Sequence, residues 1–207
     1  MKKNNNIFVI TIAVLVVGTV GLMISGSKKE DIKPAVDQHG HPLAANISAI
    51  PLDELVDKPA PDFLLADKDG RPYSLNGLRG KNILLFFNEG LMCYPACWSQ
   101  IASLAGDKRL RGDDLTVLSV VVDPPEKWQK AIEEMPELAQ ATVVFDKGAA
   151  VSRIFGMLTT ASSMHYGSLP GHTFILIDKE GMIRHIFDDP NMAIHNDELV
   201  KEIARLN

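Results

Sequence analysis

The chain has 207 residues, of which 46% are hydrophobic and 23% are charged, and its formal net charge is -5. This length fits one globular domain of about 150 residues with additional segments. The negative charge, accompanied by only short basic patches, argues against nucleic-acid binding, and the two cysteines are too few for a disulfide-rich scaffold.

The N-terminal segment predicts a membrane anchor. No charged residue occurs from Ile7 to Ser27, and about 20 helical residues span the hydrocarbon layer of a bilayer. Because a cleavable signal usually has a shorter apolar core of roughly 7–15 residues, we expect residues 1–27 to form an uncleaved transmembrane helix, with a cleaved signal as the alternative. Lys2 and Lys3 favour an N-terminus inside the cell. We therefore expect a single-pass protein of the cell membrane with its body on the extracytoplasmic side, where a thiol pair meets an oxidising setting.

Residues 28–55 are rich in Pro, Asp and Lys and show no clear periodicity, which predicts an extended linker. The remaining residues, 56–207, alternate strand-like and helix-like patterns. In chain order we expect a hairpin (60–81), a buried strand (82–88), a helix (98–110), a buried strand (115–123), a helix (124–135), a short strand (141–146), a short helix (148–158), a second hairpin (172–187) and a terminal helix with an Asn or Asp cap (196–206).

The order of these elements indicates the fold class. The run "NILLFFN" at 82–88 is continuously apolar, as in a central strand buried on both faces. Strands that alternate with helices argue for an α/β fold with a central mixed sheet and helices on both faces.

The stretch "NEGLMCYPACWSQ" contains both cysteines, Cys93 and Cys97, between this strand and the helix that follows. At the start of a helix, free backbone N–H groups and the helix dipole stabilise a thiolate. A spacing of four would place both sulfurs one helical turn apart on one face, and Pro95 suits the first turn of a helix. The pair can therefore act as a reversible redox couple, with Cys93 as the exposed attacking thiolate and Cys97 as the resolving partner, or hold a soft metal. A static disulfide or two inert buried thiols is the alternative.

Several segments in order resemble the redoxin group of the thioredoxin superfamily, which includes the alkyl hydroperoxide reductase/thiol-specific antioxidant (peroxiredoxin) family. They are "DKPAPDFLLADKDGRPYSLNGLRGKNILLFF", "LTVLSVVVDPPEKWQKAIEE", "VFDKGAAVSRIFGM" and "HTFILIDKEGMIRHIF", which lie within residues 56–207. The resemblance implies a thioredoxin-like fold and thiol redox chemistry without a cofactor. It also implies protein thiols or a hydroperoxide as substrate and a thiol electron donor as partner.

The cysteine stretch departs from each subfamily pattern. The thioredoxin motif is C-x-x-C, whereas this chain has C-x-x-x-C. The peroxiredoxin pattern P-x-x-x-T/S-x-x-C does not match the sequence, whether Cys97 or Cys93 is taken as its cysteine. Counted back from Cys97, its Pro and Thr positions hold Gly90 and Tyr94, and counted back from Cys93 they hold Phe86 and Gly90. The Sco family of copper proteins does use C-x-x-x-C with a later histidine. That resemblance implies copper, held by Cys93, Cys97 and His172, as the alternative to a protein without a cofactor.

His172 and Pro170 are the supporting candidates outside the cysteine stretch. The position of His172 in the redoxin pattern resembles that of the peroxiredoxin arginine, or of the thioredoxin cis-proline that faces the cysteines. His172 could be a copper ligand, a charged neighbour of the thiolate or an ordinary strand histidine. Pro170 is a second candidate for that cis-proline turn.

Three further residues have competing interpretations. Glu89 could accept protons, but a solvated surface carboxylate is favoured. His165 lies in a polar loop that could fold over the cysteines, although a role as ligand or base is not favoured. For Trp98, helix packing is favoured over a role in partner docking.

Three hypotheses follow. The favoured one is a membrane-anchored thiol–disulfide oxidoreductase or antioxidant of the redoxin type that uses Cys93 and Cys97. The second is a Sco-like copper chaperone that adds His172 to the pair. The third is a non-catalytic redoxin domain that serves as a docking partner.

Overall fold

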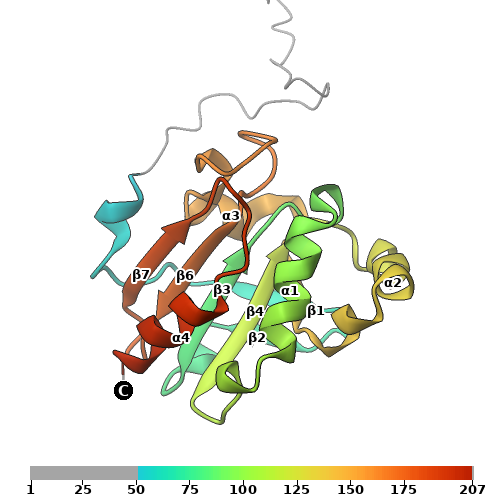
Figure 1. Ribbon diagram of the computed structural model, residues 1–207. Coiled ribbons are helices and arrows are strands. Elements are labelled where there is room, and N and C mark those ends of the chain that lie inside the picture. Colours follow the sequence, from blue (N-terminus) through green and yellow to red (C-terminus); the bar gives the residue numbers. More distant parts are fainter. Residues whose placement is uncertain (1–50, 207) are drawn as a thin grey trace, which may run out of the picture. The chain divides into compact units, whose positions relative to one another are not determined.

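The described residues, 51–206 of a computed structural model, form one seven-stranded mixed sheet in the order β2-β1-β5-β4-β3-β6-β7 (Figure 1). The strands are β1 (Leu64–Asp67), β2 (Pro72–Ser74), β3 (Asn82–Phe87), β4 (Leu115–Val121), β5 (Val143–Phe145), β6 (Thr173–Ile177) and β7 (Ile183–Asp188). β3 pairs in parallel with β4 and antiparallel with β6. The prediction of a mixed α/β sheet of the thioredoxin-like type is confirmed.

The central strand β3 is apolar because both of its faces are covered. All six of its residues are buried, and successive side chains of a strand point to opposite faces. Leu84 and Phe86 belong to one hydrophobic cluster, whereas Leu85 and Phe87 belong to the other. The hydrophobic run is continuous because alternate residues of β3 pack into the hydrophobic clusters on opposite faces of the sheet.

Helices cover both faces of the sheet, as predicted. They are α1 (Ala96–Gly106), α2 (Pro125–Glu134), α3 (Ala150–Ile154) and α4 (Asn196–Ala204). Trp98 of α1, Trp128 of α2 and Leu199 of α4 enter the cluster that contains Phe86, while Val151 of α3 enters the opposite one. The position of α1 against the sheet centre fixes where its first turn, and thus the cysteine stretch, must lie.

Both predicted hairpins are present. β1 and β2 pair antiparallel around the "DKDG" turn, where the Asp67 carboxylate accepts hydrogen bonds from the backbone N–H groups of Asp69 and Arg71. β6 and β7 pair in the same way. At the other end of the described range, Leu52–Leu55 forms a short 3-10 helix whose leucines pack on the core, so the end of the segment expected to be a linker belongs to the folded body.

The expected cap of α4 is wrong. The residue before the helix is His195, and no side chain caps the helix start. The Asn196 amide instead donates hydrogen bonds to the Ser103 carbonyl and the Asp107 carboxylate, and its oxygen accepts one from Gln100. These tertiary contacts with α1 occupy the side chain that the local sequence pattern assigned to capping.

Within residues 51–206, no helix is both long and apolar enough to cross a membrane. The predicted anchor at residues 1–27 lies outside the described residues.

Candidate active site

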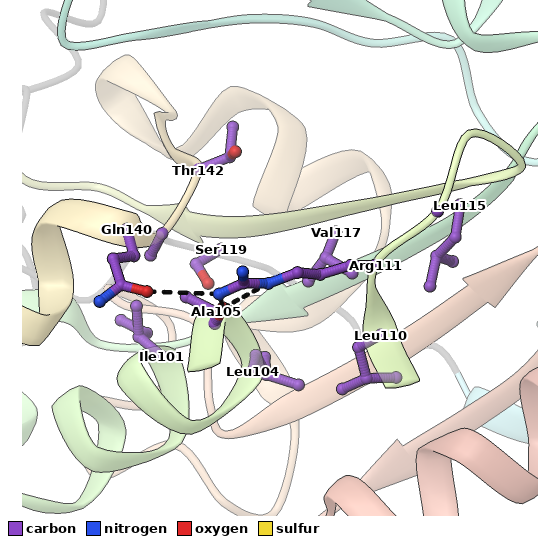
Figure 2. A pocket seen from close by; sticks show the side chains of 12 residues that line it. Ile101, Leu104, Ala105, Leu110, Arg111, Leu115, Val117, Ser119, Gln140 and Thr142 are labelled. Atoms are coloured by element: carbon purple, nitrogen blue, oxygen red, sulfur yellow. Dashed lines mark hydrogen bonds between the residues drawn. The ribbon is translucent and has the colours of Figure 1, made fainter. Parts of the chain in front are cut away.

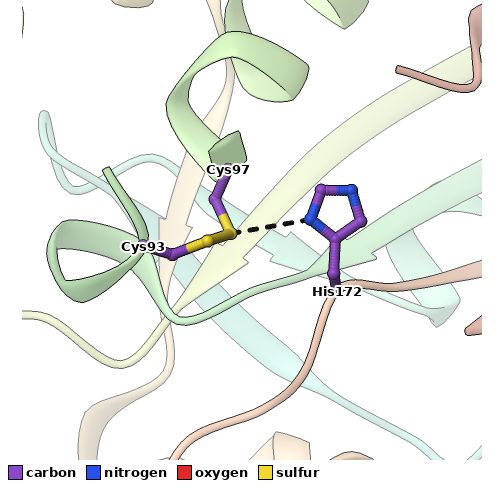
Figure 3. Close-up of side chains that lie close together, drawn as sticks. All are labelled: Cys93, Cys97 and His172. Atoms are coloured by element: carbon purple, nitrogen blue, oxygen red, sulfur yellow. Dashed lines mark hydrogen bonds between the residues drawn. A yellow bond between two sulfur atoms is a disulfide. The ribbon is translucent and has the colours of Figure 1, made fainter. Parts of the chain in front are cut away.

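Cys93 and Cys97 are joined by a disulfide at the carboxyl end of β3, with an S–S distance of 2.04 Å and Cα atoms 5.3 Å apart (Figure 3). A short 3-10 helix, η3 (Gly90–Cys93), follows β3 and is followed by α1, which begins at Ala96. The strand-to-helix junction expected from the sequence is present, and both sulfurs lie in it.

The two cysteines do not share one helical face. Cys93 ends η3, Tyr94 is extended and Pro95 precedes the first residue of α1, so only Cys97 lies in the first turn of α1. The disulfide therefore links the short helix η3 to the first turn of α1 across a bend. Because the free N–H groups of a helix gather at its first turn, they favour a thiolate at Cys97 rather than at Cys93, which the sequence pattern had favoured.

The expectation of an exposed Cys93 is also wrong. Cys93 is 2% exposed and Cys97 is fully buried, although the neighbouring side chains of Met92 and Tyr94 are 53% and 63% exposed. The turn is thus at the protein surface, while another part of the chain covers its sulfur.

His172 lies directly beside the pair. Its Nδ1 atom is 3.6 Å from the Cys97 Sγ atom (Figure 3), and its ring packs edge-on against Phe86 and Phe174. This burial lowers the pKa of His172 to about 4, although the nearby charge of Asp189 acts in the opposite direction. The imidazole beside the intact disulfide is therefore neutral at neutral pH.

Glu89 forms a buried pair with His165, so the expectation of a solvated carboxylate is wrong. The two residues are 2% and 3% exposed, and Glu89 Oε2 lies 2.9 Å from His165 Nδ1. Glu89 Oε1 also accepts hydrogen bonds from the backbone N–H groups of Met164 and His165. This arrangement attaches the loop between α3 and β6 to the turn that leads into η3.

Pro95 lies at the start of α1, as expected, whereas the resemblance suggested Pro170 for the cis-proline turn. In the part of the chain that the structure describes, the cis peptide bond joins Tyr94 and Pro95. Pro95 lies inside the disulfide loop and is exposed. Pro170 is buried two residues before His172, but it is not a cis-proline.

Gly90 is fixed by its surroundings at the start of η3. Its backbone φ is +58°, and a Cβ atom there would lie 1.8 Å from the Asp123 carboxylate. The same carboxylate accepts a hydrogen bond from the Leu91 N–H group, and burial raises its pKa above the ordinary value. The Gly90 carbonyl accepts a hydrogen bond from the indole of Trp98, whose expected role in helix packing is confirmed by its 4% exposure and its place in a hydrophobic cluster.

Sequence reasoning missed Met192 and Asp189. The Met192 Sδ atom lies 3.7 Å from the Cys93 Sγ atom, and the buried Asp189 accepts hydrogen bonds from Asn191, Ala193 and His195 in the same segment. The "DDPN" stretch at 188–191 has turn-forming residues, which could have indicated a tight turn there. No local pattern indicated that this turn reaches the cysteines 99 positions away in the sequence.

A separate cavity lies at the far end of α1 (Figure 2). It has a volume of about 320 Å³, and the guanidinium of Arg111 crosses it to donate hydrogen bonds to the Ala105 carbonyl and Gln140. Its lining contains no cysteine, histidine or carboxylate. The cysteine pair, and not this cavity, is therefore the candidate for redox chemistry.

Cys93, Cys97 and His172 each offer one donor atom, and these atoms lie within 4.8 Å of one another. Two thiolates and an imidazole suit a soft metal ion. The two sulfurs are available to a metal only after the disulfide has been reduced.

Residues 56–186 match the model of the AhpC/TSA family. The chain is 33% identical over 141 residues to "Peroxiredoxin Bcp" of Escherichia coli strain K12, a match that covers 67% of this chain and 88% of the relative. It is 27% identical over 148 residues to "Peroxiredoxin Q, chloroplastic" of Sedum lineare, covering 70% of this chain and 76% of the relative. Among solved structures it is similar to a peroxiredoxin-like protein from Aquifex aeolicus, with a TM-score of 0.63 and 19% identity over 83% of this chain and 96% of the other.

Proposed function

The chain belongs to the AhpC/TSA family as an enzyme of the peroxiredoxin-like thiol-oxidoreductase type, and from this premise we propose that Cys93 and Cys97 are a reversible redox pair that reduces hydroperoxides with electrons from a thiol donor. The observation that carries the proposal is the disulfide at the carboxyl end of β3, with only one of its two sulfurs in the first turn of α1. This asymmetry gives the two cysteines different roles.

In the oxidising half of the cycle, Cys97 is the nucleophile. Its thiolate, stabilised by the N–H groups at the start of α1, attacks the terminal oxygen of the hydroperoxide. The O–O bond breaks, the alkoxide or hydroxide that leaves takes up a proton to become an alcohol or water, and Cys97 becomes a sulfenic acid. The Cys93 thiolate then attacks the Cys97 sulfur, which forms the disulfide and releases the sulfenic oxygen as water.

In the reducing half, the donor attacks Cys93. A donor thiolate displaces Cys97 from Cys93 and forms a mixed disulfide, and the sulfur that is better stabilised as a thiolate is the better leaving group. His172 Nδ1, 3.6 Å from Cys97, is placed to donate a hydrogen bond to that thiolate in the tautomer that carries a proton there. A second donor thiol attacks the donor sulfur of the mixed disulfide, which releases the Cys93 thiolate and an oxidised donor.

Single-turnover kinetics of the reduced protein test this division of roles. Cys93→Ser should consume one equivalent of hydrogen peroxide and accumulate a sulfenic acid, which dimedone labels at Cys97, whereas Cys97→Ser should consume none. Peroxide turnover with dithiothreitol requires both cysteines. A parallel assay of insulin-disulfide reduction separates a peroxidase from an oxidoreductase of protein thiols. Absence of turnover in both assays would remove the proposal, and labelling at Cys93 would reverse the roles.

Copper binding is the second candidate, supported by the grouping of Cys93, Cys97 and His172 within 4.8 Å. The reduced protein would hold copper through two sulfurs and one nitrogen. Competition of the reduced protein with a chromophoric Cu(I) chelator tests it: His172→Ala should lower the affinity at least tenfold, and His185→Ala, on β7, is the control. Equal affinity of both variants would remove this candidate.

We also propose that residues 1–27 anchor the enzyme in the cell membrane and that residues 28–55 connect the anchor to the domain on the extracytoplasmic side. The support is the uncharged run from Ile7 to Ser27. Extraction of membranes with alkaline carbonate should leave the full chain in the pellet and release a chain that lacks residues 1–27. Recovery of the full chain in the soluble fraction would overturn this proposal.

A further inference from the structure

The segment at residues 189–195, here called the covering segment, folds around one buried carboxylate. It joins β7 to α4. Asp189 is 3% exposed and accepts hydrogen bonds from the N–H groups of Asn191 at 2.8 Å and Ala193 at 2.6 Å. The Met192 N–H group donates to the Asp189 carbonyl. These contacts give the segment a defined backbone shape.

The covering segment is attached to both elements that hold the site. The Asp189 N–H group donates to the carbonyl of His172, the residue beside Cys97. The His195 ring lies 2.7 Å from the Asp189 carboxylate, and the His195 N–H group donates to Gln100 of α1. His195 therefore connects the segment to the helix that carries Cys97.

This shape places Met192 over Cys93. Met192 has a φ of +53°, in the left-handed region that bulky residues rarely adopt. Its Sδ atom lies 3.7 Å from the Cys93 Sγ atom. Cys93 is only 2% exposed although its neighbours Met92 and Tyr94 are 53% and 63% exposed, so its sulfur is buried within a turn at the protein surface, where Met192 lies against it.

We propose that Met192 determines access to Cys93: it covers the sulfur that an incoming thiol must reach, and Asp189 positions it there. A thiolate must contact a disulfide sulfur directly to attack it, so Met192 has to move away before the mixed disulfide forms. An unbranched methionine can do so by rotation of its side chain. The inference rests on the proposed function only in taking Cys93 as the sulfur that the donor attacks.

The rate at which a thiol opens the disulfide tests the proposal. The oxidised full chain is mixed with dithiothreitol or with the bulkier glutathione, and free thiols are trapped and counted at intervals. Met192→Ala should raise the second-order rate constant about tenfold, and more for glutathione than for dithiothreitol. Met192→Leu, which nearly conserves the volume, should stay within about twofold of the wild type. An unchanged rate in Met192→Ala, or an equal gain in Met192→Leu, would overturn the proposal.

Two further measurements separate covering from other effects. The reduction potential is an equilibrium quantity, and a side chain that only blocks access does not change it. Met192→Ala should therefore have the wild-type potential. A rate gain explained entirely by a shifted potential would overturn the proposal. Asp189→Asn should also accelerate opening, but it should add nothing in combination with Met192→Ala if both act through the same contact. If Asp189→Asn does not fold, the two Met192 variants carry the test alone. None of these measurements uses peroxide, so the inference and the proposed peroxidase function can fail separately.

Discussion

The Nδ1 atom of His172 lies 3.6 Å from the Sγ atom of Cys97, at the boundary between a buried aromatic cluster and the first turn of α1. One side of the imidazole is therefore apolar, and the other faces the Cys97 sulfur, the proposed leaving group. The ring is neutral in this setting, so it can assist the thiolate as a hydrogen-bond donor but not as a permanent positive charge.

The first prediction concerns the rate of disulfide opening in His172→Ala. Loss of one hydrogen bond to a thiolate, worth about 1.4 kcal/mol or more, should slow opening by dithiothreitol about tenfold. Stopped-flow mixing that follows tryptophan fluorescence measures this rate, because Trp98 lies next to Tyr94 in the disulfide loop. His185→Ala is the matched control. If both variants open at the wild-type rate, His172 only fills space.

The second prediction concerns stability as a function of pH. Burial lowers the pKa of His172 from 6.5 to about 4, so between these values the unfolded chain takes up a proton that the folded chain does not. Folding stability should therefore fall as the pH drops from about 6.5 to about 4, by up to roughly 3 kcal/mol from this residue. Guanidinium unfolding of the oxidised protein with a chelator present, at pH 7 and pH 5, measures the loss. His172→Gln should lose less stability over the same interval, and equal losses would contradict the assignment.

The third prediction concerns the buried pair of Glu89 and His165. Glu89→Gln removes the carboxylate that holds His165 and two backbone N–H groups, and breaking a buried pair costs on the order of 3 kcal/mol. Chemical unfolding should show a loss of this size. Asp69→Asn, which removes the exposed pair with Lys68, should change stability by less than about 1 kcal/mol. Equal effects of the two substitutions on the free energy of unfolding would show that the buried pair does not stabilise the fold.

The fourth prediction compares two glycines with positive φ. Gly90 has a φ of +58° and Gly70 has a φ of +78°, but a Cβ atom at Gly90 would meet the Asp123 carboxylate whereas nothing lies within 4 Å of one at Gly70. Gly70→Ala should cost only the backbone strain of about 1–2 kcal/mol, and Gly90→Ala should cost several kcal/mol more. Thermal unfolding of both variants makes the comparison, which fails if their melting temperatures are equal.

The sheet and its helices could be predicted from the sequence because their signals are local. The apolar run that forms β3 and the proline at the start of α2 each determine a structure within a few residues. The position of the cysteines between β3 and α1 was predictable for the same reason. The sequence did not predict which cysteine lies in the helix. A spacing of four places two residues on one face only in a continuous helix, whereas the chain bends at Tyr94 and Pro95.

The surroundings of the cysteines could not be read locally because they depend on contacts between distant segments. Glu89 had the pattern of a surface carboxylate, and only the return of the loop with His165 buries it. Met192 reaches Cys93 only because β6 and β7 bring the chain back beside β3. Charged and apolar side chains that become neighbours through sheet topology leave no periodic pattern in the sequence.

Gln100 connects the helix that carries Cys97 to the end of the covering segment. Its buried amide lies three positions after Cys97 on α1, accepts a hydrogen bond from the N–H group of His195 and donates one to Asn196. The same helix thus carries one sulfur of the disulfide and fixes the end of the segment that bears Met192.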